Sequence, residues 1–147
     1  MTEHAWFAPL AIVGGALLWV TIWVSVIFLA AHISGWKKLS KLYPDMGGSG
    51  GKKRRWVYGK MGATRYNGVL ILEASPVGLR LSLLWGFNFG HPPILIPWAE
   101  LSGPEKSEHK WLGVYGSKFG AQKTDVTFVF LQGTAEWIEQ QRKEFLG

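Results

Sequence analysis

The sequence contains no cysteine, and this absence removes several classes of site. Without thiols there is neither a disulfide framework nor a cysteine-based zinc site, and His4, His32, His91 and His109 lack a metal-ligand spacing such as HxxxH. Ser75, Ser82, Ser102, Ser107 and Ser117 lack a G-x-S-x-G context, and the glycine-containing segment at 113–120 lacks GK[ST]. We therefore expect no metal, no cofactor and no enzymatic activity. The lack of cysteine also agrees with a reducing compartment.

Charge is absent from residues 5–33, which contain no Asp, Glu, Lys or Arg. At ~1.5 Å per residue, residues 9–33 cover about 36 Å, which exceeds the ~30 Å hydrocarbon core of a bilayer. A removable signal peptide is the alternative, but the preceding residues carry Glu3 and no Lys or Arg. We interpret the segment as a transmembrane helix.

The basic residues follow this segment and predict its orientation. Because positive charge stays on the cytoplasmic side, we expect the N-terminus outside and the rest of the chain in the cytoplasm. Acidic lipid is a second explanation for the same charges, and nucleic acid is a third. We expect no nucleic-acid partner, because only Trp56 and Tyr58 adjoin the main basic cluster. The candidate lipid-contact residues are Lys37, Lys38, Lys41, Lys52, Lys53, Arg54 and Arg55, and a lipid sensor would add Lys60 and Arg65.

The segment directly after the apolar run is amphipathic. Trp36, Leu39 and Tyr43 recur at helical spacing with lysines between them, which predicts a short helical extension. We expect these three side chains to lie on lipid headgroups, with Trp6 and Phe7 as interface aromatics at the other end of the anchor.

Composition divides the chain into three parts. Residues 1–43 form the transmembrane helix with its extension, residues 44–55 form a glycine-rich basic linker, and residues 56–147 form one folded domain. Residues 47–51 are glycine and serine, so they predict a flexible tether.

The folded domain shows short extended segments followed by one amphipathic helix, which predicts an α+β fold. We expect a small antiparallel β-barrel or bent sheet closed by a C-terminal α-helix whose buried face includes Trp137. The expected strands are residues 67–75 and 78–87, joined by a turn at 75–78, then 94–98, 109–115 and 124–131; a loop covers 116–123 and the helix covers 134–146. Pro97 places its strand at an edge or a bulge.

Two stretches, ASPVGLRLS at 74–82 and HPPILIPW at 91–98 followed by Glu100 and Leu101, resemble a family of small uncharacterised bacterial membrane-anchored proteins. The cytoplasmic part of these proteins resembles a pleckstrin-homology or GRAM-type barrel. The resemblance covers residues 67–101 and implies a pleckstrin-homology-like fold in the bacterial cytoplasmic (inner) membrane. It implies no particular chemistry.

Two groups of residues are candidate contacts with a protein partner. Trp85, Phe87 and Phe89 alternate with small or turn-forming residues, which predicts a hydrophobic loop tip that contacts a partner or the bilayer. Ala11 and Gly15 have the small-xxx-small spacing that allows a second helix to approach, although lipid covers such positions equally well.

Three functions remain open at this stage. The first is a single-pass, non-enzymatic interaction module that serves as an accessory subunit of a membrane protein complex, with lipids and other membrane subunits as partners. The second is a domain that binds anionic lipid headgroups at the cytoplasmic leaflet. The third is a small hydrolase, for which no nucleophile and base can be named.

Overall fold

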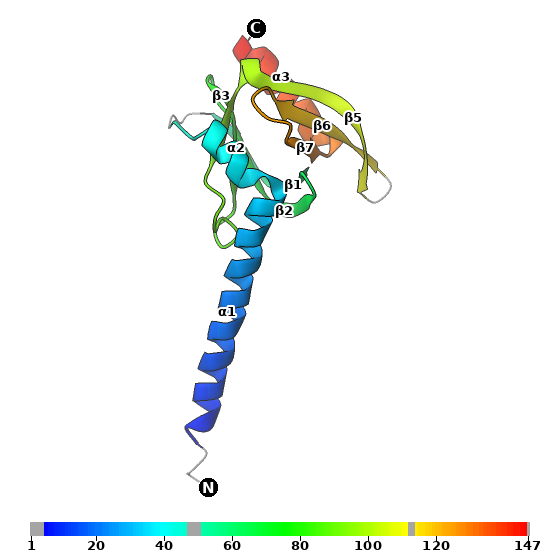
Figure 1. Cartoon of the computed structure of the whole chain (residues 1–147). Helices are drawn as coiled ribbons and strands as arrows, with labels where there is room; N and C mark the ends of the chain where they lie inside the picture. The colour runs from blue at the N-terminus through cyan, green and yellow to red at the C-terminus, as the bar shows by residue number, and fades with distance from the viewer. Residues whose placement is uncertain (1–4, 47–50, 112–113, 147) are drawn as a thin grey trace.

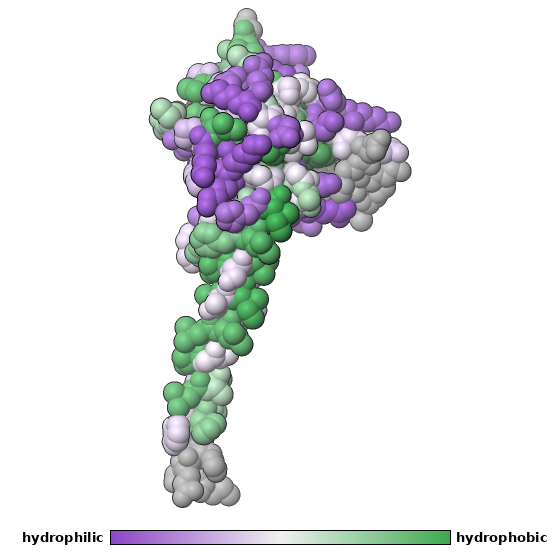
Figure 2. Space-filling model, viewed as in Figure 1, coloured by the Kyte–Doolittle hydropathy of each residue, from purple (hydrophilic) through white to green (hydrophobic). Residues whose placement is uncertain are grey.

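A long helix and a compact β domain form the molecule in the computed structural model, which describes residues 5–46, 51–111 and 114–146 (Figure 1). The first helix, α1 (Phe7–Ser34), has 28 residues and projects from the domain as a rod. Hydrophobic residues cover the rod, whereas hydrophilic residues are spread over the domain face in view (Figure 2). Among the described residues, α1 alone is long and apolar enough to cross a membrane.

A glycine separates α1 from the short helix α2 (Trp36–Leu42). Gly35 has φ +85°, in the left-handed region that favours glycine, and it ends α1. A Cβ atom at this position would lie 2.8 Å from Cγ2 of Val126. The chain therefore turns into the β domain directly after the apolar helix.

Seven antiparallel strands form one sheet in the order β4-β3-β2-β1-β7-β6-β5. The sheet curls into a half-barrel (Figure 1). A 3₁₀ helix, η2 (Trp98–Glu100), connects β4 to β5. The strands are β1 (Lys52–Met61), β2 (Thr64–Ala74), β3 (Gly78–Leu83), β4 (Ile94–Pro97), β5 (Leu101–Trp111), β6 (Val114–Ala121) and β7 (Thr127–Phe130).

The structure confirms the predicted hairpin of β2 and β3. Leu72 lies opposite Leu81, and both side chains are fully buried, whereas Glu73 lies opposite Arg80 on the other face. Pro97 ends β4 at the edge of the sheet, as its missing N–H requires.

Two of the predicted segments are wrong. The strand expected at 109–115 spans the end of β5 and the start of β6, and most of the loop expected at 116–123 belongs to β6. Glycine suits β6 because the neighbouring strand lies close; a Cβ at Gly120 would lie 2.9 Å from Oγ of Ser102. The expected linker also differs, because β1 begins at Lys52 and not after Arg55. The part of the glycine-rich tether at 47–50 lies outside the described residues.

The headgroup placement of the amphipathic extension is wrong. Trp36 and Leu39 are fully buried and Tyr43 is 3% exposed, all within the core of the β domain. The indole Nε1 of Trp36 donates to the carbonyl of Pro92 at 2.7 Å, and the Leu95 amide donates to the carbonyl of Tyr43 at 3.1 Å. The apolar face of α2, which we expected to contact lipid, therefore packs against β4.

The last helix, α3 (Gln132–Leu146), packs on the sheet at β6 and β2. Ile138 is fully buried, Ala135 and Gln141 are nearly so, and Trp137 and Phe145 are only partly buried. The predicted closing helix is thus confirmed, but its deepest side chain is Ile138 and not Trp137.

Candidate functional site at the anchor–domain junction

The loop at residues 84–90 packs along the side of α1. The indole Nε1 of Trp23 donates to the carbonyl of Gly86 at 2.8 Å, and the ring centroids of Trp23 and Phe87 lie 5.0 Å apart. Gly90, with φ +68°, approaches the ring of Phe28 so closely that it leaves no room for a side chain. These contacts fix the β domain against the part of α1 nearest to it.

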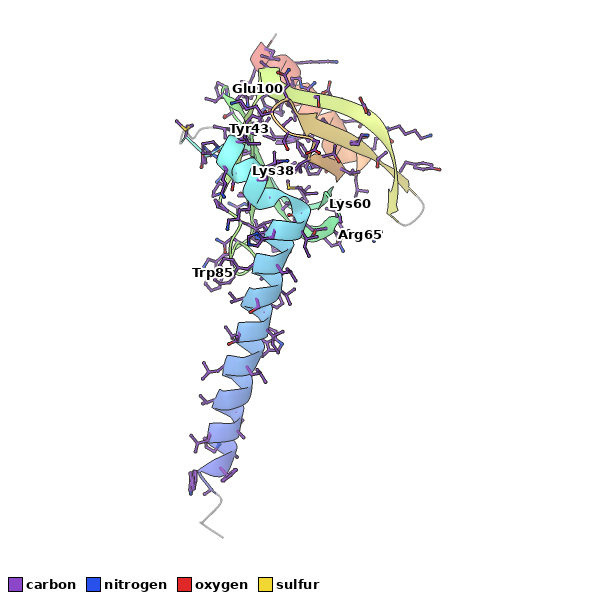
Figure 3. All side chains as sticks on the ribbon, viewed as in Figure 1. Lys38, Tyr43, Lys60, Arg65, Trp85 and Glu100 are labelled. Carbon is purple, nitrogen blue, oxygen red and sulfur yellow. The ribbon has the colours of Figure 1, made fainter. Side chains whose placement is uncertain are left out.

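The three aromatic residues of this loop differ in exposure. Trp85 is 90% exposed and Phe89 is 38% exposed, in agreement with the predicted hydrophobic tip. Phe87 differs from that prediction, because it is partly buried between the core and Trp23. The exposed tip consequently consists of Trp85 and Phe89, and in Figure 3 Trp85 lies beside α1 below the main body of the domain.

A chain of buried polar groups joins the end of α1 to this loop. Nδ1 of His91 lies 2.8 Å from the carbonyl of Phe89, which can only accept, so Nδ1 carries the proton of the neutral ring. Nε2 then accepts from the hydroxyl of Tyr66 at 2.8 Å, and the Tyr66 hydroxyl lies 2.9 Å from Oγ of Ser34. His91 is 3% exposed and Ser34 1%, so the chain of hydrogen bonds is closed to bulk water.

Burial favours the neutral forms of His91 and Tyr66, the two ionisable groups in this hydrogen-bond network. Burial lowers the pKa of His91, and the hydrogen bond to the Phe89 carbonyl opposes that effect. Burial raises the pKa of Tyr66, against a smaller lowering by Ser34. A raised phenol pKa is the opposite of what an activated nucleophile needs.

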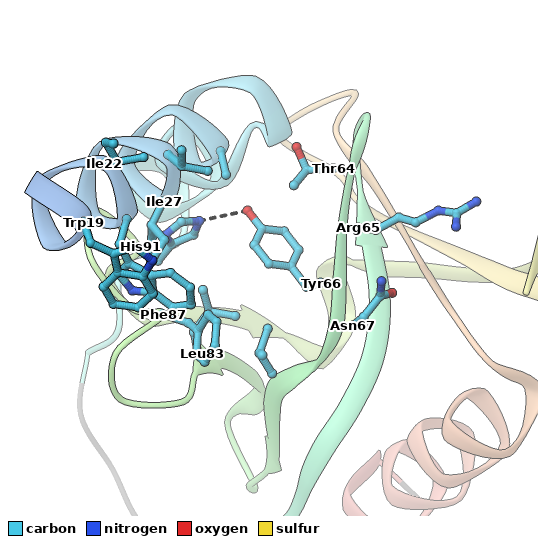
Figure 4. A pocket seen from close by; sticks show the side chains of 14 residues that line it. Trp19, Ile22, Ile27, Thr64, Arg65, Tyr66, Asn67, Leu83, Phe87 and His91 are labelled. Atoms are coloured by element: carbon cyan, nitrogen blue, oxygen red, sulfur yellow. Dashed lines mark hydrogen bonds between the residues drawn. The ribbon is translucent and has the colours of Figure 1, made fainter. Parts of the chain in front are cut away.

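An apolar pocket of about 370 Å³ lies between α1 and the domain (Figure 4). We call it the junction pocket. One face of α1 forms its first wall, with Trp19, Ile22, Trp23, Val26, Ile27 and Ala30. The domain forms the other wall, with Thr64, Arg65, Tyr66, Asn67, Val69, Leu83, Phe87 and His91. Figure 4 shows Tyr66 pointing toward His91, whereas Arg65 extends away from Tyr66 on the other side of β2.

The candidate lipid-contact residues fall into two groups. Lys37, Lys38 and Lys41 are exposed on α2, where Lys38 forms an exposed salt bridge of 3.3 Å with Asp125. Lys52, Lys53, Arg54 and Arg55 are exposed on the first half of β1, at the end of the β1–β2 ribbon opposite the turn that touches Ser34. At ~3.3 Å per residue that end lies up to about 30 Å along the strand, which is beyond the ~8–10 Å reach of screened charge. Lipid contact by this second group stays a prediction, and the arrangement disfavours it.

The proposed helix contact at Ala11 and Gly15 stays a prediction. Both Ala11 and Gly15 are exposed, and a Cβ atom at Gly15 would meet no described atom within 4 Å. Their four-residue spacing continues to Trp19 and Trp23, so they lie on the helix face that ends at the junction pocket.

Sequence reasoning missed Tyr66 and the connection of His91 to it. His91 hydrogen-bonds to the carbonyl of Phe89 in its own loop, but its second partner comes from β2. The four-residue spacing of Trp19 and Trp23 indicates that their rings lie side by side on one face of a helix. The contact of Trp23 with the loop at 84–90 could not be predicted, because the loop is distant in the sequence.

No family model, curated protein or solved structure matches this chain. Among the described residues there is also no group of three or more His, Asp or Glu side chains arranged to hold a metal ion.

Proposed function

We propose that this chain is a single-pass membrane protein whose β domain is a non-enzymatic binding module held at the membrane surface. The observation that carries the proposal is the contact between the loop at 84–90 and α1, since it positions the exposed Trp85 beside the anchor. A helix of 28 residues is about 42 Å long, or some 12 Å more than a hydrocarbon core needs. Trp85 and Phe89 then lie at the interfacial level where aromatic side chains are most stable.

The burial of the end of α1 supports a retained anchor over a cleaved signal sequence. Ala31 and Ser34 are each 1% exposed and pack in the domain core or its polar chain. Removal of α1 would therefore remove residues that are buried in the folded domain.

The orientation that we propose places the N-terminus outside and the β domain on the cytoplasmic face of a bacterial inner membrane. Lys37, Lys38 and Lys41 directly follow α1, whereas Glu3 precedes it, and this bias supports the assignment. The bacterial setting depends on the family resemblance of residues 67–101. Within such a membrane the module would serve as an accessory subunit, with its partner bound at the domain surface or along α1.

A single-cysteine experiment tests the membrane-surface position, because the native chain has no cysteine. Trp85→Cys and, as the control, Val77→Cys would each carry a polarity-sensitive fluorophore on the full chain in lipid nanodiscs. Val77 is 55% exposed in the β2–β3 turn, at the end of β2 remote from Ser34. We expect lipid-borne quenchers to quench the label at position 85 and soluble quenchers to quench the label at 77. Equal quenching of both labels by the soluble agent would refute the proposal.

A further inference from the structure

Two basic residues lie side by side on the β1–β2 hairpin next to the end of α1. Lys60 pairs directly with Arg65 across the two strands, so their side chains leave the same face. Like charges in this position repel one another, yet neither residue forms a salt bridge within the described part of the chain. An anion bound between them would replace this repulsion by attraction.

The position of this pair corresponds to the headgroup layer. The turn between Lys60 and Arg65 includes Gly62, whose Cβ would lie 2.6 Å from the carbonyl oxygen of Ser34, the last residue of α1. Figure 3 shows Lys60 and Arg65 together where α1 meets the domain. An apolar helix that ends in a bilayer ends among lipid phosphates, so both cations lie at phosphate depth.

The junction pocket begins at the same place. Arg65 belongs to its wall and extends outward from it, whereas the opposite wall is the apolar face of α1 between Trp19 and Ala30. Lys60 and Arg65 carry positive charge near the Ser34 end of α1, on the other side of β2 from Tyr66, and the pocket beside them is lined by the apolar face of α1. This order of charge followed by hydrocarbon corresponds to that of a phospholipid. We infer that the junction pocket binds one anionic phospholipid, with its phosphate at Lys60 and Arg65 and one acyl chain against α1.

The interior of the pocket suits an acyl chain. Its volume of about 370 Å³ falls within the ~300–1,000 Å³ of small-ligand sites. Tyr66 and His91 satisfy one another at 2.8 Å, so an apolar guest leaves neither without a hydrogen bond. A partner helix would cover the apolar wall equally well but would leave Lys60 and Arg65 without a counter-charge.

Lipid selectivity of the full chain provides the test. We would measure retention of phosphatidylglycerol and phosphatidylcholine by native mass spectrometry, and thermal stability with each lipid added in detergent. The intact protein should retain phosphatidylglycerol preferentially. Lys60→Gln with Arg65→Gln should reduce that preference by about thirtyfold, because each basic residue contributes attraction to an anionic lipid surface. Lys52→Gln with Lys53→Gln removes the same charge at the far end of β1 and should leave the preference unchanged.

A second pair of variants tests the acyl chain. Ala30→Phe places a ring in the pocket and should prevent retention of either lipid, whereas Leu17→Phe, at an exposed position of α1 outside the pocket, should not. Inorganic phosphate and glycerol phosphate should fail to displace the lipid, since they lack the chain. Displacement by either compound would point to a phosphate site alone and would overturn the inference.

Three further outcomes would also overturn it. These are a preference insensitive to Lys60 and Arg65, retention unaffected by Ala30→Phe, and a cross-link from Val26→Cys to a second polypeptide helix in the pocket. The inference depends on the proposed membrane-surface position, but the two fail separately. The quenching experiment at position 85 tests that position, and none of the lipid-selectivity variants alters Trp85 or Phe89.

Discussion

Hydrogen bonds of Tyr66 connect α1 with β2 and with His91 at the end of the loop. The Tyr66 hydroxyl lies 2.9 Å from Ser34 of α1 and 2.8 Å from His91, and its ring packs edge-on against Trp36 and His91. A buried acceptor that loses its donor costs about 1–3 kcal/mol of stability. Removal of the Tyr66 hydroxyl should therefore change the free energy of unfolding by a measurable amount.

We predict that Tyr66→Phe lowers the free energy of unfolding by about 1–3 kcal/mol, because Nε2 of His91 loses its donor. Chemical denaturation of the full chain in detergent would measure the change. Tyr58→Phe is the matched control, since Tyr58 is 47% exposed and its substitution should cost less than about 0.5 kcal/mol. Equal effects of the two substitutions would contradict the hydrogen-bond chain.

The lowered pKa of His91 predicts a pH dependence of stability. In the unfolded chain His91 takes up a proton near pH 6.5, whereas burial makes protonation of the folded protein harder. Its contribution is therefore complete above pH ~6.5 and is lost as the pH falls below that value toward the folded pKa. Denaturation midpoints measured between pH ~7.5 and ~5.5 should fall more steeply for the native chain than for His91→Gln. Parallel profiles would show that His91 protonates freely when folded.

At the scale of elements, the break between α1 and α2 decides where the apolar helix ends. Gly35 supplies both the left-handed backbone and the space beside Val126 that this break requires. The resulting turn directs Trp36 and Leu39 into the core. With a continued straight helix, the same side chains would remain outside the domain.

Gly35→Ala should thus destabilise the protein by roughly 1–3 kcal/mol, through backbone strain at positive φ and the close approach to Val126. Gly14→Ala is the control within α1, because it is helical and a Cβ there meets nothing within 4 Å. The control should be neutral or slightly stabilising. Thermal unfolding in detergent would separate the two variants, and a destabilised Gly14→Ala with a normal Gly35→Ala would reverse the interpretation.

The burial of residues on α3 predicts which of two neighbouring substitutions destabilises the protein more. Ile138 is fully buried and Trp137 is only partly buried, so Ile138→Ala should cost about 2–5 kcal/mol. Trp137→Ala should cost less than Ile138→Ala despite the larger side chain removed. Denaturant midpoints of both variants at equal slope would give the order; the reverse order would place Trp137 as the plug.

At the scale of the whole molecule, α1, α2 and the β domain share one core. Trp36, Leu39 and Tyr43 come from the segment after α1, and Asp45 forms a 3.0 Å salt bridge with Arg80 of β3. Pro44 bridges to Ile94 and protects the edge of the sheet. The domain boundary at residue 56 that composition favoured therefore divides a single folded unit.

Truncation tests this unity directly. A chain that begins at residue 52 should lack a cooperative thermal transition, because it loses the buried side chains of Trp36, Leu39 and Tyr43 and the cover of β4. A chain that begins at residue 34 retains these groups and should unfold cooperatively in detergent. Circular dichroism during heating would distinguish them, and a cooperative transition in the shorter chain would show that the β strands and α3 suffice.

The sequence by itself determined the features that depend on local pattern. An uncharged stretch long enough to cross a membrane indicates one apolar helix. The alternation of Leu79, Leu81 and Leu83 with polar residues indicates a half-buried strand, and Pro97 indicates a strand at the edge of the sheet. The spacing of residues 134–146 likewise specified a helix with one buried face. Each of these signals is contained within one element.

Tertiary structure alone decided what the apolar faces contact. Trp36, Leu39 and Tyr43 form the same amphipathic pattern whether lipid or protein covers them, and only the curl of the sheet supplies the competing surface. The two walls of the junction pocket are 34 to 72 positions apart in the sequence, from Ala30 and Thr64 at the least to Trp19 and His91 at the most. Local periodicity carries no information about such pairings, because burial rewards any apolar face that finds a complementary one.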